Sequence, residues 1–237
     1  MKAWLALRSA LFYAGYAVLV VVFGLLVCTV GLLLPIGPRQ ALASVGNGLV
    51  LQWLRLTCGV RFVVEGAEHI PRHPFVAVSN HQSPWETYYL QRALRPVSTI
   101  LKRELLRIPF FGWGLWAVRP IVIDRAQPKR AARQVLEQGK QRIAAGLSVV
   151  VYPEGTRIPH GQFGSYARSA AALAIACGVP LLPVAHNAGR HWPARRFLKY
   201  PGTITVVFGK PLAPEGDARA LTERARLWIQ AEQRRIG

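Results

Sequence analysis

The feature that most constrains this chain is an uncharged apolar run near its N-terminus. The run extends over 24 residues, from Leu11 to Leu34, and is followed by Pro35. About 20 apolar residues are enough for a helix to cross the hydrocarbon core of a bilayer. A signal peptide is the competing interpretation, because Lys2 and Arg8 supply a basic leading segment. The run is too long for that interpretation, and no small-residue cleavage site precedes a polar start. We therefore predict a retained membrane anchor.

A second and less apolar stretch, Ala41–Val60, contains the polar residues Asn47, Gln52 and Arg55. Either a weak second span or a helix lying in the headgroup layer would fit this composition. Cations occur on both sides of the first run, so the positive-inside rule does not decide its orientation. A hairpin of two membrane-embedded helices would place the N-terminus and the rest of the chain on the same side. We predict that residues 1–60 form a membrane-anchoring segment.

The net charge narrows the class of partner. The chain of 237 residues carries a formal net charge of +19, yet 51% of its residues are hydrophobic and only 17% are charged. Disordered basic proteins combine high charge with low hydropathy, so disorder is excluded. A large positive excess indicates an anionic partner, either nucleic acid or a membrane surface. The cations lie in clusters beside apolar segments, and no zinc-finger, RNP or homeodomain pattern occurs. We therefore predict anionic membrane lipids as partners and no nucleic acid.

No cysteine or histidine pattern indicates a metal site. The three cysteines lie in apolar stretches without CxxC spacing, which is typical of buried thiols in a reducing compartment. His160, His186 and His191 do not form a ligand-like set. We expect structural roles for these histidines and no bound metal.

From about residue 61 onward, short strands rich in Val and Ile alternate with helical runs. This alternation predicts an α/β sheet whose loops gather at one edge, and we assign it to residues 61–237. The predicted strands are Phe75–Ser79, Val97–Leu101, Pro120–Ile123, Ser148–Tyr152, Leu181–Ala185 and Thr203–Phe208. The predicted helices are Pro84–Leu94, Lys129–Ala145, Ser165–Cys177 and Asp217–Ile236.

The sharpest local feature is the segment SNHQSPWE at residues 79–86, between a predicted strand and a predicted helix. Ser83, Pro84 and Glu86 match a capping box, in which Glu86 accepts a hydrogen bond from the backbone N–H of Ser83. His81 precedes the cap by two residues, and a turn would let its ring meet Glu86. A helix N-terminus favours a carboxylate and disfavours an imidazolium, so a neutral His81 could act as a base oriented by Glu86. Capping and catalysis are compatible in one carboxylate, and both interpretations stay open.

Cationic residues follow other predicted strands. The motif Glu154-Gly155-Thr156-Arg157 comes after a buried strand, where a glycine turn would present Arg157 at the edge at which α/β sites form. A guanidinium binds phosphate through two parallel hydrogen bonds. Lys102 and Arg125 also lie at strand ends and could add charge to the same anion site. A structural Asp124–Arg125 pair is the alternative for the latter.

The run Ile108–Val118 is unusually aromatic, with two phenylalanines and two tryptophans. Its simplest interpretation is core. A wall for an acyl chain or a membrane-facing surface is the alternative.

Taken together, these motifs resemble those of the 1-acyl-sn-glycerol-3-phosphate acyltransferases, also called lysophosphatidic acid acyltransferases. The resemblance rests on His81 with Glu86 five residues later, Lys102-Arg103-Glu104-Leu105, the strand end at 121–125, Glu154 to Arg157, and VPLLPVAHN at 179–187, in family order and spacing. It covers about residues 62–211. The resemblance implies a glycerolipid acyltransferase-type mixed sheet flanked by helices, with membrane-embedded helices at the N-terminus.

The resemblance also implies an activity. His81 would deprotonate the sn-2 hydroxyl of the lysolipid while Glu86 orients the ring, and the acyl group of acyl-CoA or acyl-carrier protein would then form phosphatidic acid. Arg157, helped by Lys102, would hold the glycerol phosphate. Neither a metal nor a cofactor beyond the acyl donor is implied. The expected location is a bacterial-type inner membrane, with the catalytic domain facing the cytoplasm.

Two departures from the family pattern keep the acceptor open. Glu86 stands where the family usually has Asp. Ala167 and Ser169 replace a typical Lys and Gly, and Arg168 is a candidate substitute for the missing cation. The alternatives are an acyltransferase acting on another lysophospholipid or a lyso-ornithine lipid, and a non-catalytic protein that binds anionic membranes.

Overall fold

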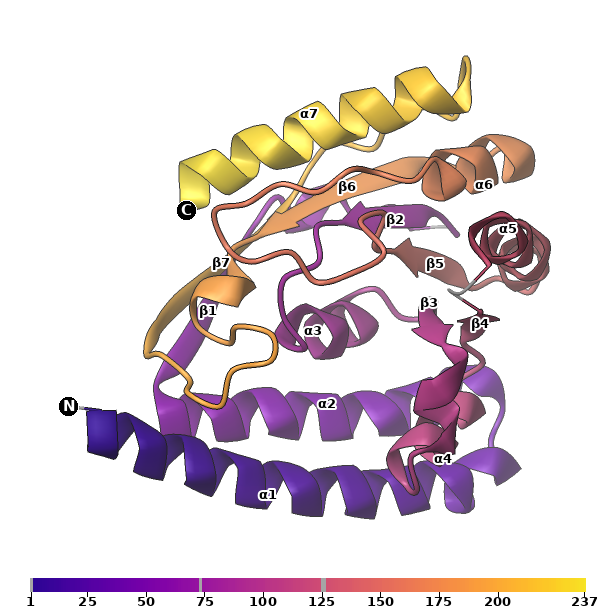
Figure 1. Cartoon of the computed structure of the whole chain (residues 1–237). Helices are drawn as coiled ribbons and strands as arrows, with labels where there is room; N and C mark the ends of the chain where they lie inside the picture. The colour runs from indigo at the N-terminus through magenta and orange to yellow at the C-terminus, as the bar shows by residue number, and fades with distance from the viewer. Residues whose placement is uncertain (1, 73, 125–126) are drawn as a thin grey trace.

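The computed structural model describes residues 2–72, 74–124 and 127–237. Within these residues the chain forms a mixed seven-stranded sheet of order β1-β7-β6-β2-β5-β3-β4 (Figure 1). Every neighbouring pair is parallel except β6 and β7. The strands are β1 Val60–Glu65, β2 Val76–Ser79, β3 Val97–Lys102, β4 Ile121–Ile123, β5 Ser148–Val151, β6 Leu181–His186 and β7 Gly202–Phe208. The predicted mixed α/β sheet is confirmed.

Strand β1 was not among the predicted strands. It lies at one end of the sheet, and five of its six residues are exposed. Such a strand lacks the continuous apolar run of the buried strands β2 and β5, whose residues are all buried. Its pairing with β7 is a contact between segments far apart in the chain, which local composition does not reveal.

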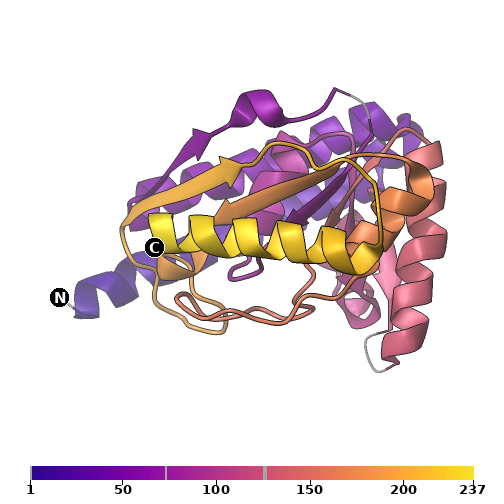
Figure 2. The same ribbon diagram turned by 90° about the horizontal axis from the view of Figure 1, so that it is seen from above.

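Helices cover both faces of the sheet, as Figures 1 and 2 show. The helices are α1 Lys2–Cys28, α2 Ile36–Cys58, α3 Trp85–Ala93, α4 Phe111–Ala117, α5 Pro128–Ala144, α6 Ser169–Cys177 and α7 Ala218–Ile236. One apolar core joins α1, α2 and α3 to the sheet, and a second joins α5, α6 and α7 to it. The loops that follow β2 and β5 therefore emerge between two helical layers.

Helix α6 corrects one predicted boundary. The sequence predicted its start at Ser165, whereas the helix begins at Ser169. The preceding residues are held in a loop because the backbone N–H of Ala167 donates to the carbonyl oxygen of Pro153. The helix is followed by Gly178, which caps it in the left-handed region with φ +64°.

The predicted N-terminal anchor is a helical hairpin that packs on the sheet's α3 side (Figure 1). The apolar run does not continue as one helix to Leu34, because α1 ends at Cys28 and a short 3₁₀ turn follows. Helix α1 also packs closely on α4: a Cβ atom at Gly24 would collide with the carbonyl oxygen of Phe110. Phe12 of α1 is fully buried in the same core as Trp85. The proposed domain boundary at residue 60 stays a prediction.

The outer surface of the hairpin is apolar. Within the described residues, one segment, Lys2–Leu33, is long and apolar enough to cross a membrane by length and composition. Large side chains stand exposed on its outer side and on the neighbouring α4, among them Trp4, Leu7, Leu11, Val18, Val22, Leu25, Trp113 and Trp116. An exposed apolar surface of this extent indicates membrane association.

Candidate active site

The predicted pair His81 and Glu86 meets in the structure. His81 lies in the turn between β2 and α3, and its Nδ1 atom is 2.7 Å from Glu86 Oε1. The same oxygen accepts hydrogen bonds from the backbone N–H groups of Gln82 and Ser83, at 3.0 and 2.9 Å. Because an ionised carboxylate only accepts, the hydrogen of the His81–Glu86 bond is on Nδ1. The lone pair of Nε2 is then available, which is the arrangement of a general base and its orienting group.

Glu86 performs the predicted capping role as well. Glu86 Oε1 accepts the Ser83 N–H, and Ser83 Oγ accepts the Trp85 N–H at 3.0 Å, so each side chain satisfies a backbone donor at the start of α3. Burial by itself would raise the pKa of the Glu86 carboxyl, which is fully inaccessible. The adjacent His186 and His81 rings and the donated N–H of Ser83 oppose burial and hold this pKa below its ordinary value. The carboxylate therefore stays ionised near neutral pH.

A second buried histidine lies behind this pair. His186 Nε2 is 2.8 Å from the carbonyl oxygen of Asn80, and its Nδ1 accepts from the N–H of Ala188 at 3.2 Å. A carbonyl accepts only, so His186 is a neutral ring protonated at Nε2. Burial lowers the pKa of His186, in agreement with this neutral form. Glu86 Oε2 lies 3.9 Å from His186 Nε2, and this contact favours the ionised carboxylate of Glu86.

Asn80 connects the strand end that carries His186 to the turn that carries His81. Its amide donates to the carbonyl oxygen of His186 at 2.9 Å and accepts from the His186 N–H at 3.0 Å. Our sequence analysis expected only a structural role for His186 and missed Asn80. Each residue directly follows a predicted strand, and that position was the signal available in the sequence; the structure shows that the two strands are adjacent and parallel.

The loop at residues 154–158 holds the backbone of His81 through two hydrogen bonds. Glu154 Oε2 accepts the His81 N–H at 2.7 Å, and the N–H of Ile158 donates to the His81 carbonyl oxygen at 2.8 Å. Gly155 makes the turn possible, with φ +67°. Burial raises the pKa of Glu154 to about 7. The ring of Tyr152, which the sequence analysis did not single out, stacks on the His81 ring at a centroid distance of 4.3 Å.

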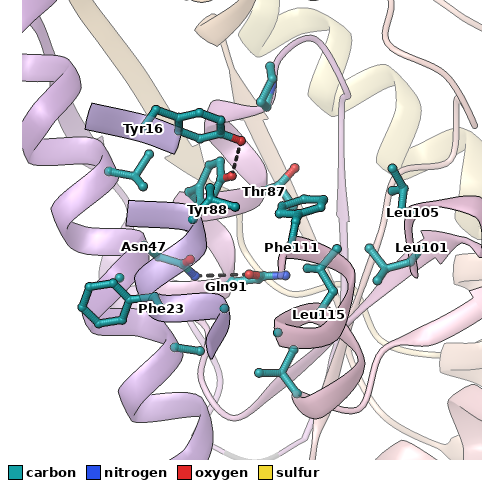
Figure 3. A pocket seen from close by; sticks show the side chains of 18 of the residues that line it. Tyr16, Phe23, Asn47, Thr87, Tyr88, Gln91, Leu101, Leu105, Phe111 and Leu115 are labelled. Carbon is teal, nitrogen blue, oxygen red and sulfur yellow. Dashed lines mark hydrogen bonds between the residues drawn. The ribbon is translucent and has the colours of Figure 1, made fainter. Parts of the chain in front are cut away.

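His81 and Tyr152 border a cavity of about 470 Å³ that residues of the N-terminal helices also line (Figure 3). His81, Thr156, Arg157 and Lys102 contribute to its wall, so the structure brings four residues of the predicted site together. Arg195, which the sequence analysis did not select as a site residue, contributes as well. The apolar part of the wall comes from four helices and the end of β3, with Leu19, Val20, Phe23, Leu101, Leu105, Phe111 and Leu115 among its residues.

Two polar pairs interrupt the apolar wall. The hydroxyl oxygens of Tyr16 and Tyr88 are 2.6 Å apart, and Asn47 donates to Gln91 at 3.2 Å (Figure 3). Each pair joins a helix of the hairpin to α3. The hairpin thus forms part of the cavity wall, and its outer side presents an apolar surface.

The aromatic run at 108–118 divides between two environments. Phe111 and Leu115 of α4 line the cavity. Trp113 and Trp116 of the same helix are exposed, at 45% and 59%. This division matches the predicted wall and membrane-facing surface better than a fully buried core.

Arg125, a predicted cation of this site, lies outside the described residues. Two other cations considered from sequence, Lys102 and Arg168, have neighbours that limit their part in it. Lys102 Nζ is 3.8 Å from Glu104 Oε2, so its charge is partly offset. Arg168 lies in another surface hollow with Arg219 and Arg226, and it does not take the place of a cavity cation.

A sequence model of the acyltransferase family matches residues 61–187. The chain is 44% identical over 229 residues to a 1-acyl-sn-glycerol-3-phosphate acyltransferase of Pseudomonas aeruginosa, a match that covers 94% of this chain and 89% of the relative. The chain belongs to the 1-acyl-sn-glycerol-3-phosphate acyltransferase family. The mouse 1-acyl-sn-glycerol-3-phosphate acyltransferase alpha is 30% identical over 91% of this chain and 76% of its own length.

The fold of this acyltransferase matches a solved relative. The crystal structure of the 1-acyl-sn-glycerophosphate acyltransferase PlsC from Thermotoga maritima superposes with a TM-score of 0.81 and 26% sequence identity. The match covers 97% of this chain and 94% of that one, so it includes the N-terminal hairpin. The non-catalytic alternative from the sequence analysis is not favoured for a member of this enzyme family.

Proposed function

We propose that the protein transfers an acyl group from an acyl thioester to the sn-2 hydroxyl of 1-acyl-sn-glycerol 3-phosphate, forming phosphatidic acid in phospholipid biosynthesis. The observation that carries the proposal is the 2.7 Å contact between His81 Nδ1 and Glu86 Oε1, beside an apolar cavity that has cations on its wall. The names of the relatives support the same acceptor.

In the proposed reaction, His81 Nε2 removes the proton of the sn-2 hydroxyl. The alkoxide oxygen attacks the thioester carbonyl carbon, the new ester bond forms, and the C–S bond breaks. The proton on His81 then passes to the leaving thiolate. Glu86 keeps the ring in the required tautomer and stabilises the transient imidazolium. The donor, acyl-CoA or acyl-carrier protein, is a co-substrate, and the proposed reaction needs no metal, cofactor or covalent acyl-enzyme.

The two chemically distinct parts of the cavity suit the two parts of such a substrate. Arg157 and Lys102 would bind the glycerol phosphate through charge-assisted hydrogen bonds. Arg125 is proposed as a further cation of this site. The apolar wall built by α1, α2, α3 and α4 would receive an acyl chain.

We place the enzyme at the inner membrane of a bacterial cell, with its catalytic domain facing the cytoplasm. The exposed apolar side chains of the hairpin and α4 support contact with lipid. The net charge of +19 supports attraction to anionic lipids.

The proposal is tested by transfer of labelled acyl groups in membranes that carry the full chain. Acyl-CoA and acyl-carrier-protein donors of one chain length are offered with lysophosphatidic acid, another lysophospholipid or a lyso-ornithine lipid. We expect lysophosphatidic acid to be the preferred acceptor and His81→Ala to lower turnover by about 10²–10⁴-fold. His160→Ala is the control, because His160 lies outside the cavity lining. Undiminished turnover in His81→Ala would rule out the mechanism, and preference for another acceptor would reassign the substrate.

A further inference from the structure

A third cation, Arg195, lies at the cavity and has no role in the proposed reaction. Arg195 belongs to the segment between β6 and β7 and lines the cavity together with Arg157 and Lys102. Across the described residues, its side chain makes no hydrogen bond or ion pair. Its backbone is in the left-handed region, with φ +59°. A non-glycine residue stays in that conformation only where its surroundings impose it.

A buried lysine imposes the course of this segment. Lys199 is 1% exposed, and its Nζ donates to the carbonyl oxygens of Arg196 and Phe197, both at 2.8 Å. Nζ also donates to the Tyr13 hydroxyl of α1 at 2.9 Å. The backbone N–H of Lys199 donates to Ser9 Oγ at 2.9 Å. One side chain therefore holds the residues that directly follow Arg195 and fastens them to α1.

Aromatic packing against α1 holds the residues on both sides of Arg195. The Trp192 ring meets the edge of Phe12 at a centroid distance of 4.9 Å and that of Tyr16 at 6.0 Å. Phe197 stacks on Tyr13 at 5.4 Å. Arg195 thus lies between two points attached to α1, which keeps its backbone beside the cavity, while its side chain is exposed and lines the cavity.

We propose that Arg195 is a third cationic ligand for a phosphate group of a substrate, and that Lys199 is the residue that positions it. A phosphate ester carries up to two negative charges, and the charge of Lys102 is partly offset by Glu104 at 3.8 Å. An additional free guanidinium meets that demand with two parallel donors. The phosphate belongs either to the glycerol phosphate of the acceptor or to the carrier of the acyl donor. The inference rests on the proposed function.

The test compares two adjacent arginines in the detergent-purified full chain. Arg195→Gln removes the cavity cation, whereas Arg196→Gln removes an equal charge from an exposed neighbour that does not line the cavity. We expect Arg195→Gln to raise one KM about tenfold or more with kcat nearly unchanged, and Arg196→Gln to change neither. A raised KM for lysophosphatidic acid assigns the acceptor phosphate, and a raised KM for acyl-CoA or acyl-carrier protein assigns the donor. Unchanged KM values, or an equal effect of both variants, would overturn the proposal.

A separate set of KM measurements tests whether Lys199 positions Arg195. Lys199→Met is expected to raise the same KM as Arg195→Gln, and the double variant should be no worse than Arg195→Gln alone. Tyr13→Phe keeps the ring but removes one acceptor of Nζ, so it should raise that KM by a smaller factor even if Lys199→Met folds poorly. Additive effects of Lys199→Met and Arg195→Gln, or a different affected KM, would show that Lys199 does not act through Arg195.

Two further measurements distinguish failure of this inference from failure of the proposed function. Turnover of lysophosphatidic acid by the unmodified protein tests the proposed reaction. Calorimetric titration of the unmodified and Arg195→Gln proteins with lysophosphatidic acid and with coenzyme A tests phosphate binding without turnover. We expect one of the two ligands to bind about tenfold more weakly to Arg195→Gln. Equal affinities of both proteins for both ligands would overturn the inference.

Discussion

The carboxyl group of Glu154 accepts the backbone N–H of His81 at 2.7 Å, across 73 residues of sequence. Through this bond, the turn after β5 holds the turn after β2, because β2 and β5 are adjacent parallel strands. The arrangement fixes the backbone from which the candidate base projects. The same carboxyl group has a pKa raised to about 7 by burial.

This raised pKa predicts a pH-dependent contribution to stability. Glu154 binds its proton more tightly in the folded chain than at its ordinary pKa of 4.5. Its contribution is therefore complete below about pH 4.5 and is lost as the pH rises through about 7. Glu154→Gln keeps an acceptor for the His81 N–H and does not titrate. We expect the free energy of unfolding of the native protein, relative to this variant, to fall by roughly 1–3 kcal/mol between pH 4.5 and 8.

Denaturant unfolding in detergent at several pH values measures this difference. Glu154→Ala serves as the control, since it removes the acceptor and should be less stable than Glu154→Gln throughout the range. Parallel pH profiles of the native protein and Glu154→Gln would contradict the raised pKa.

Replacing Glu86 tests its two roles. Glu86→Gln removes the charge that orients and stabilises His81, and we expect turnover to fall by about 10²-fold or more with little change in KM. The glutamine oxygen can still accept from Ser83, so part of the capping role is retained. Steady-state kinetics in membranes measures the effect. Glu137→Gln, at an exposed pair with Arg133 on α5, is the matched control and should leave kcat unchanged.

Narrowing the cavity should change the choice of acyl chain. Leu115 of α4 projects into the apolar part of the cavity (Figure 3). Leu115→Trp fills part of a volume of about 470 Å³, so we expect the preferred acyl chain to become shorter. Competition among acyl donors of increasing length measures this preference. Leu227→Trp, at an exposed position on α7, is the control, and an unchanged preference in Leu115→Trp would argue against an acyl chain in this part of the cavity.

Helix α4 should lie against lipid. Trp113 and Trp116 of α4 are exposed, and α4 packs beside α1, whose outer surface is apolar (Figure 1). In vesicles containing brominated acyl chains, we expect the Trp113→Phe/Trp116→Phe double variant to lose a large part of the quenchable tryptophan fluorescence. Trp228→Phe removes a ring on the opposite face of the sheet and should leave the quenchable part intact. Equal losses in the two variants would place α4 away from the bilayer.

Local patterns predicted much of the fold because they depend on neighbouring residues. The buried strands β2 and β5 have continuous apolar stretches, and the capping box at 83–86 needs only one helical turn. Strand β1 escaped prediction because its residues are exposed and its partner β7 is remote in sequence. The start of α6 was misplaced because a bond from Ala167 to Pro153 keeps the preceding residues in a loop.

The sequence by itself determined the apolar N-terminal segment, the alternation of strands and helices, and the identity of the His81, Glu86 and Arg157 motifs. Only the tertiary structure decided that His186 stands behind Glu86 as a neutral ring, that Glu154 holds the His81 backbone, and that α1 builds a wall of the cavity. The first group follows from side-chain chemistry and periodicity within a few residues. The second depends on contacts between segments tens to more than a hundred residues apart, which exist only once strand order and helix packing bring those segments together.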